Sequence, residues 1–324
     1  MLRLTFTAAD VASTRFAYSP LWEVVASVRA LRQPGAHALH LPWLRWARRR
    51  LAGAELAPLY DLVPAGTRTT PGFLTPAPST VEPELAAELA ALRRTPSDLV
   101  RDSLDRMPWR RSPTVEALYA DPRAGLPRLV AAIETYWELA LAPHWARLRA
   151  LLEGDVLYRT RRLAEGGAAA LFNDLHPGIA WDGDELRVAH TDVRRAATLT
   201  GTGLVLVPSA YVWPKVYSKT VQPWQPVLRY PARGVATLWE SGGAASPAAV
   251  AAVLGRSRAL LLAELDAPAS TTELARRTGI TPGGVSQHLT ALRDAGLVTG
   301  HRDRRSVLYA RTAVADALLA AAAP

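Results

Sequence analysis

The stretch from Ser270 to Arg311 constrains the fold of this chain most, because nearly every residue in it suits one position in a short, regular pattern. Ser270 and Glu273 have the spacing of a capping box, in which the serine side chain accepts one N–H at the start of a helix and the glutamate reaches back for another. Gly279 can adopt the left-handed backbone that ends a helix. Residues 271–278 are therefore predicted to form a helix, with Leu274 on its inward face.

A second helix is predicted three residues later. Thr281 is a good N-cap, and Pro282 stands at the first helical position, where its missing N–H costs nothing. Apolar residues then follow at spacings of four and three, which places them on one buried face. These are Val285, Leu289 and Leu292, and they leave Ser286, Gln287, Thr290 and Arg293 on or beside the opposite face. Two capped helices joined by a tight turn are typical of a helix-turn-helix, whose second helix fits the DNA major groove.

A hairpin with a basic tip is predicted after the second helix. Segments Leu297–Thr299 and Ser306–Arg311 have the character of strands, and the six residues between them are Gly-His-Arg-Asp-Arg-Arg. Arginines on such a tip bind phosphates or enter the minor groove. The alternative is a solvated hairpin whose arginines protect a sheet edge from aggregation. The neighbouring helix pair favours the first interpretation, a β-wing.

At this point the chain resembles the ArsR family of bacterial winged-helix repressors. The similarity extends over about Pro247 to Arg311. It is carried by Leu254-Gly255-Arg256, Glu273-Leu274-Ala275, Val285-Ser286-Gln287-His288-Leu289, Leu292-Arg293, Ala295-Gly296-Leu297-Val298 and Arg304-Arg305-Ser306. The resemblance implies a dimeric protein that binds a palindromic operator in double-stranded DNA and blocks transcription until a signal releases it.

Two departures from that family change the expectation. Its metal sensors carry paired cysteines before the recognition helix, whereas this chain has no cysteine and has Thr271 and Thr272 near that place. Gly283 and Gly284 stand where side chains usually help to read the operator, which shifts base contact to Gln287, because glutamine can bond an adenine edge bidentately. The predicted DNA-binding residues are Thr281, Gly283, Gly284, Ser286, Gln287, His288, Arg293, Arg302, Arg304 and Arg305.

Charge and composition set wider bounds. The formal net charge of +9 suits a polyanionic partner, but residues 247–324 hold nine arginines against six acidic residues, so basicity alone does not locate the DNA site. The sequence contains no long apolar run and no signal-peptide pattern, which predicts a cytoplasmic protein without membrane contact. The lack of cysteine excludes disulfides, thiolate metal sites and thiol redox sensing.

The chain is predicted to be an α+β protein with two domains. Residues 1–240 form a mixed helical and β domain for sensing or dimerisation, 241–246 form a linker, and 247–324 form the winged helix-turn-helix. An alternating pattern at Leu2, Leu4 and Phe6 indicates an edge strand. Five helical zones are expected at 22–31, 41–51, 83–92, 97–107 and 122–152, an exposed loop at 64–80, and short strands at 179–181, 186–190, 204–207, 227–230 and 235–238.

The first domain shows little sign of catalysis. His37 and His40 have a spacing that metal ligands sometimes use, but no third ligand is evident, and a structural role is favoured. Nucleophile-elbow, zinc-protease and phosphate-loop motifs are lacking. We therefore expect no enzyme activity, no metal and no cofactor.

Aromatic residues are concentrated in the first domain. All ten tryptophans precede residue 241, and most of them are explained by a large core. Trp213, Tyr217 and Trp224, however, lie in an irregular, proline-interrupted segment, 210–226, that could border a pocket. The sequence thus predicts a DNA-binding regulator, a homodimeric repressor controlled by a small organic effector held at these three aromatics. The alternatives are a winged-helix protein-interaction module and a regulator fused to an enzyme domain.

Overall fold

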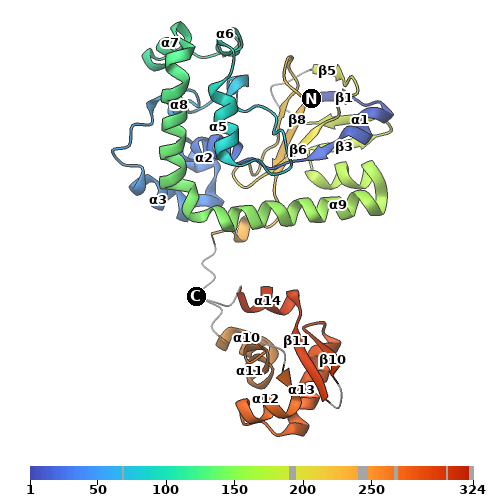
Figure 1. Cartoon of the computed structure of the whole chain (residues 1–324). Coiled ribbons are helices and arrows are strands. Elements are labelled where there is room, and N and C mark those ends of the chain that lie inside the picture. The colour runs from blue at the N-terminus through green and yellow to red at the C-terminus, as the bar shows by residue number, and fades with distance from the viewer. Residues whose placement is uncertain (68, 190–194, 240–246, 266–268, 304–305, 321–324) are drawn as a thin grey trace. The chain divides into compact units, whose positions relative to one another are not determined.

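The computed structural model describes residues 1–324 except for 68, 190–194, 240–246, 266–268, 304–305 and 321–324. The chain divides into two compact units, Met1–Trp239 and Glu240–Pro324, which are described separately (Figure 1). The predicted linker, 241–246, lies outside the described residues. The fold is α+β, as the sequence predicted.

The first unit contains eight α-helices before residue 145 among its described residues. They are α1 (Ala8–Ser13), α2 (Pro20–Arg32), α3 (Leu41–Arg50), α4 (Ala57–Tyr60), α5 (Leu85–Arg93), α6 (Ser97–Asp105), α7 (Pro113–Ala120) and α8 (Pro122–Tyr136). Short 3₁₀ turns lie at Pro34–Ala36, Ala38–His40 and Gly72–Leu74. Helix α2 is buried along nearly its whole length, and together with α5 and α8 it encloses the helical core. This core explains most of the aromatic residues, among them Trp43 and Tyr136.

The long helix α9 (Trp145–Leu175) follows α8 through a π-helical turn at Trp137–Leu141 and a 3₁₀ turn at Ala142–His144. It bends sharply at Gly166 and Gly167, where Gly167 has a φ of +66° that favours glycine. The bend lets Arg159 donate to both the main-chain and the side-chain oxygen of Asp174. In a straight helix residues fifteen apart would be separated by about 22 Å. Figure 1 shows α9 beneath the helical and the strand-rich parts of this unit.

Two four-stranded sheets make up the rest of the first unit. The first sheet has the order β3 (Ile179–Asp182), β4 (Glu185–Val188), β1 (Leu2–Thr5), β5 (Arg195–Thr198). The second has the order β2 (Arg15–Phe16), β6 (Val205–Ser209), β8 (Val227–Pro231), β7 (Tyr217–Lys219). Strands β2, β6 and β8 are parallel, β7 runs antiparallel to β8, and β3 and β4 form the hairpin predicted at Asp182-Gly183.

The second sheet is buried on both faces. Leu206, Leu228 and Tyr230 share a core with the first sheet and with the second half of α9. Val205, Val207 and Val227 face the other way and pack against Trp22 of α2. Every residue of β6 and β8 is buried, which is typical of parallel strands covered on both sides.

Several details differ from the sequence-based expectation. The predicted edge strand at Leu2 and Leu4 is an inner strand, because β1 pairs with both β4 and β5. The predicted strand at 235–238 is a 3₁₀ turn, Val235–Thr237. The helical zone expected to end at Leu152 continues to Leu175. Loop 64–80 is only partly exposed, because Phe73 and Leu74 are fully buried in the helical core.

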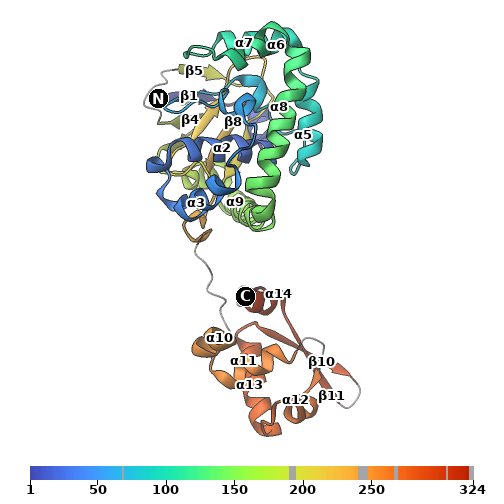
Figure 2. The ribbon, with the colours of Figure 1, turned by 90° about the vertical axis from the view of Figure 1, so that its left-hand side faces the viewer.

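The second unit consists of five helices and a three-stranded sheet among its described residues. Its helices are α10 (Pro247–Leu254), α11 (Arg256–Ala263), α12 (Thr271–Thr278), α13 (Pro282–Asp294) and α14 (Ala313–Ala320). The sheet has the order β10 (Val298–Asp303), β11 (Ser306–Arg311), β9 (Ala269–Ser270). Leu261, Leu262, Leu274 and the buried face of α13 form its core. Figure 2 shows this unit from another side; its α13 packs against β10 of the hairpin.

Candidate nucleic-acid interface and ligand cavity

The turn between α12 and α13 has the predicted caps. The Ser270 hydroxyl accepts from the Glu273 N–H at 3.2 Å, and Gly279 ends α12 in the left-handed conformation with a φ of +71°. The Thr281 hydroxyl then accepts from the Gly284 N–H at 3.3 Å. The reciprocal half of the capping box differs from the prediction, because the Glu273 carboxylate pairs with Arg276 and Arg277. Two charged partners outcompete a single backbone N–H for this carboxylate.

Helix α13 has one apolar and one polar face. Val285, Leu289 and Leu292 are buried in the core of the second unit, as predicted. Exposed positions on the other side are Thr281, Gly283, Ser286, Gln287, Thr290 and Arg293, while Gly284 and His288 are half-buried. A long side chain at Gln287 and a cation at Arg293 thus face solvent on the same helix, where a major groove can accept them.

The wing is longer than the sequence indicated. Strands β10 and β11 pair from Val298 and Arg311 to Asp303 and Ser306, so 300–303 belong to a strand instead of a six-residue loop. Cross-strand pairing supplies hydrogen bonds to these backbone groups despite their polar side chains, which the periodicity of the sequence could not show. Arg302 is therefore a strand residue opposite Val307. Arg304 and Arg305 lie outside the described residues.

An apolar surface formed by α10 and α14 is left uncovered within the second unit. Val253 is 84% exposed and Val314 is 63% exposed, and Leu318 is also exposed. Helix α14 is anchored by Ala315 and by the Thr312 cap, whose hydroxyl accepts from the Ala315 N–H at 3.4 Å. We call Val253, Val314 and Leu318 the α10–α14 patch.

Comparison with known proteins agrees with this geometry. Residues 256–301 match a family described as a helix-turn-helix domain. The second unit is a winged helix-turn-helix domain. This match supports a DNA-binding regulator and does not single out the ArsR family. A crystal structure described as the predicted DNA-binding transcriptional regulator from E. coli is 34% identical, covers 22% of this chain and 81% of its own, and has a TM-score of 0.20.

The first unit has a different match. Residues 100–236 match a family of unknown function, DUF5937. No curated protein matches the chain. The helix-turn-helix domain is thus combined with a first unit whose role has to be argued from its own side chains.

Two of the three predicted ligand-binding aromatics share a cavity of about 380 Å³ in the first unit. Tyr217 belongs to β7. The Trp224 ring packs against Gly72 of loop 64–80, so closely that a Cβ added to Gly72 would lie 2.4 Å from Nε1 of Trp224. Trp22 of α2 also lines this cavity. Trp213 does not line this cavity and is 38% exposed, so the structure does not bring it together with Tyr217 and Trp224. The segment 210–226 is not wholly irregular, because it contains β7, which pairs with β8 and sets Tyr217 opposite Arg229.

Basic side chains in this cavity were missed by the sequence analysis. Arg29, Arg229 and Lys219 line it, and both arginines are 4% exposed. Each stands alone among apolar neighbours, Arg29 within Val28-Arg29-Ala30-Leu31 and Arg229 within Val227-Leu228-Arg229-Tyr230. A single arginine within an otherwise apolar segment is a sequence signal that could have identified these two residues, because arginine is rarely buried without a partner.

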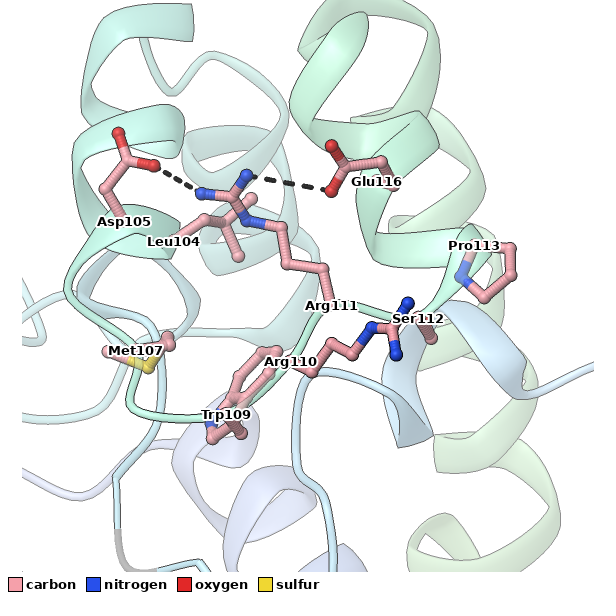
Figure 3. Close-up of a pocket in the computed structure, with 9 residues that line it drawn as sticks. All are labelled: Leu104, Asp105, Met107, Trp109, Arg110, Arg111, Ser112, Pro113 and Glu116. Atoms are coloured by element: carbon pink, nitrogen blue, oxygen red, sulfur yellow. Dashed lines mark hydrogen bonds and ion pairs between the residues drawn. The ribbon is translucent and has the colours of Figure 1, made fainter.

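A second depression, of about 630 Å³, lies between α6 and α7 (Figure 3). Its central cation, Arg111, lies between Asp105 and Glu116, as Figure 3 shows. The positive charge of Arg111 is thus offset by two carboxylates of the protein itself. Arg110, which also lines this depression, is exposed to solvent.

The histidine pair has a structural setting. His40 Nδ1 accepts from the Trp239 indole at 2.6 Å, and burial lowers the pKa of His37 and of His40 to about 4. Within the described part of the chain, no group of three or more His, Cys, Asp or Glu side chains could hold a metal ion. No helix in that part has the length and apolar character needed to cross a membrane.

Proposed function

We propose that this protein is a transcription regulator in which the second unit binds a two-fold symmetric DNA operator as a homodimer. The observation that carries the proposal is α13, which has an exposed polar face and a buried apolar face. The turn before it is capped by Gly279 at the end of α12 and by Thr281 at the start of α13. A recognition helix needs this combination, because its position is fixed by the core while its outer side chains reach the bases. The wing would add contacts to the DNA backbone.

The α10–α14 patch supports the dimer. Exposed apolar side chains of two neighbouring helices gain free energy when a second copy covers them. The two copies would place their recognition helices about 34 Å apart, one turn of DNA.

We further propose that the first unit controls DNA binding through a small-molecule effector in the cavity beside Tyr217, and that the protein acts by binding and not by catalysis. In the simplest scheme it is a repressor whose operator is released when the effector binds. An effector can shift DNA binding only if it has different affinities for the two states of the dimer.

Replacing Gln287 tests DNA recognition. Operator sites are first selected from a random double-stranded library with the full-length protein, and binding is then measured by fluorescence anisotropy. Gln287→Ala is expected to weaken binding by about 1–3 kcal/mol and to relax the preference at one base position per half-site. Arg94→Gln, an exposed change in the first unit, serves as the control and should bind like the wild type. Equal affinity of the wild type for selected and scrambled DNA would contradict the proposal.

A further inference from the structure

Two buried guanidinium groups face the cavity beside Tyr217. Arg29 comes from α2 and Arg229 from β8, and each is 4% exposed. The Tyr217 ring is shared by both, with its centroid 5.0 Å from Cζ of Arg29 and 5.1 Å from Cζ of Arg229. Two like charges are thus held near one another at low exposure, an arrangement that raises the free energy of the folded chain unless an anion joins them.

The hydrogen bonds of these two side chains are incomplete. Nε and Nη2 of Arg29 and Nε of Arg229 have no acceptor among the described residues. Nη1 of Arg229 donates to the main-chain oxygen of Trp22 at 3.4 Å, which is a long contact. A buried guanidinium N–H without a partner costs more than a neutral group would, because the charge strengthens the bond it lacks.

Acidic groups of the protein offset the charges of Arg29 and Arg229 only in part. Glu23 interacts electrostatically with Arg229, but its Oε2 accepts from the Ala210 N–H at 3.0 Å, and burial raises its pKa to about 7. Among the residues that the structure describes, no aspartate or glutamate lines the cavity. Two other arginines of the first unit show the contrast, since Arg159 has Asp155 and Asp174, and Arg111 has Asp105 and Glu116 (Figure 3).

The walls of the cavity suit a flat apolar body. Trp22, Tyr217 and Trp224 contribute aromatic surface around a volume of about 380 Å³. This volume lies in the range of small-molecule sites, about 300–1,000 Å³. A bare inorganic ion would satisfy the guanidiniums and leave the aromatic surface uncovered.

We infer that the cavity beside Tyr217 binds a small organic oxyanion, a carboxylate or a phosphate monoester on a planar apolar body, whose oxygens accept from Arg29 and Arg229. Arginine suits this role because its planar fork of donors matches carboxylate and phosphate geometry. The inference rests on the proposed function in one respect, because it concerns the cavity proposed as the effector site. Whether the anion binds there does not depend on whether it also changes DNA binding.

Lys219 supplies a further cation, in addition to the exposed Arg106 and Arg195 that also line the cavity. Its Nζ donates to the carbonyl oxygens of Gly72 and Thr75, each at 2.6 Å, and lies 4.2 Å from the centroid of the Trp224 ring. An ammonium group has three N–H donors, so one remains for a ligand oxygen. Burial lowers the pKa of Lys219 to about 7. A bound anion would stabilise the protonated lysine, and the affinity for the anion should fall as the pH rises through 7.

The test compares acids with their neutral isosteres on the full-length protein without DNA. Benzoate, 1-naphthoate, phenyl phosphate and 1-naphthyl phosphate are titrated by isothermal calorimetry, with benzamide, 1-naphthamide and inorganic phosphate as controls. At least one aromatic anion should bind at least tenfold more tightly than its amide and than inorganic phosphate. The carboxylate and phosphate arms show which head group is preferred. Equal binding of acids and amides, or binding of none of the four acids, would overturn the inference.

Matched variants locate the site. Arg29→Met and Arg229→Met keep the length of the side chain and remove a buried charge, and each should weaken the preferred anion at least tenfold while the exposed control Arg94→Gln leaves it unchanged. Unchanged affinity in both methionine variants would refute the site. If a variant does not fold, the acid and amide comparison on the wild type still decides.

Failure of the inference can be distinguished from failure of the proposed function. An anion that binds the wild type without changing operator affinity keeps the inference and removes the effector role. Operator release by a neutral compound, with none of the four acids bound, keeps the effector role and removes the inference.

Discussion

Gly283 and Gly284 are neighbours in the first turn of α13, yet their surroundings differ. A Cβ at Gly284 would lie 3.1 Å from Cγ2 of Ile280 and 3.2 Å from the Thr281 hydroxyl oxygen, so packing explains this glycine. A Cβ at Gly283 would meet nothing within 4 Å. No packing in the described part of the chain therefore explains Gly283, whereas close approach of the backbone to DNA would.

Gly283→Ala separates stability from binding. Alanine favours a helix over glycine by up to about 1 kcal/mol, so the variant should unfold at the same or a higher temperature than the wild type. Its operator affinity should nevertheless fall, because the added methyl group occupies the space between helix and DNA. Thermal denaturation and anisotropy measured on the same preparation test this. A variant that binds the operator as well as the wild type would show that Gly283 does not contact DNA.

The buried histidines predict a dependence of stability on pH. The pKa of His40 is about 4 in the folded chain and about 6.5 when unfolded, so between these values the unfolded chain binds more protons. The histidine contribution to the free energy of unfolding should thus decrease as the pH falls from 6.5 to 4. Glu23 and Glu88, whose pKa burial raises to about 7, act in the opposite direction.

A variant isolates the histidine contribution. His40→Gln is expected to be less stable than the wild type at pH 7, because it loses the bond from Trp239, and the difference should shrink toward pH 4. Urea unfolding at a series of pH values measures both curves. A difference that stays constant from pH 7 to 4 would show that His40 does not titrate in this range.

At the scale of elements, α14 packs one side on the core of its own unit and exposes another. Ala315 is fully buried and Leu319 is half-buried, whereas Val314 and Leu318 are exposed. The apolar side chains of α14 are thus divided between the core of its own unit and the surface. Only the exposed part, with Val253 of α10, is available to a second copy.

Charging the α10–α14 patch should dissociate the proposed dimer. Val314→Asp combined with Leu318→Asp places two carboxylates where apolar contact is expected, and sedimentation should change from dimer to monomer. The operator affinity should fall with it, because each half-site is then bound separately. Val81→Asp, at an exposed valine of the first unit, is the control. A double variant that remains dimeric would assign dimerisation to other residues.

At the scale of the whole molecule, the two units are linked by a thermodynamic requirement. If an anion in the first unit weakens operator binding by some factor, the operator must weaken anion binding by the same factor. Calorimetric titration of the preferred anion with and without saturating operator should therefore give two dissociation constants whose ratio equals the loss of operator affinity. A ratio of one, with operator release still observed, would place the effector site outside this cavity.

The sequence by itself determined the local structure of the second unit. The helix caps act on backbone groups within three or four residues of Ser270, Gly279 and Thr281. Helical periodicity alone places Val285, Leu289 and Leu292 on one face. Such short-range rules also located α2, α3, α5 and α6 of the first unit. Whether these elements read a particular operator stays a prediction.

Tertiary structure decided the features that depend on contacts between residues distant in the chain, namely strand pairing and the cavity. The inner position of β1 follows from pairing with β4 and β5, nearly 200 residues away, and the extension of β10 follows from pairing with β11. The cavity is the clearest case, because Arg29 and Arg229 come from elements two hundred residues apart that meet across Tyr217. Local pattern found Tyr217 and Trp224 as aromatics in an unusual segment. Only the packing of α2 against the second sheet brought the two cations to them, since the burial of a charge depends on the whole fold and not on its sequence neighbours.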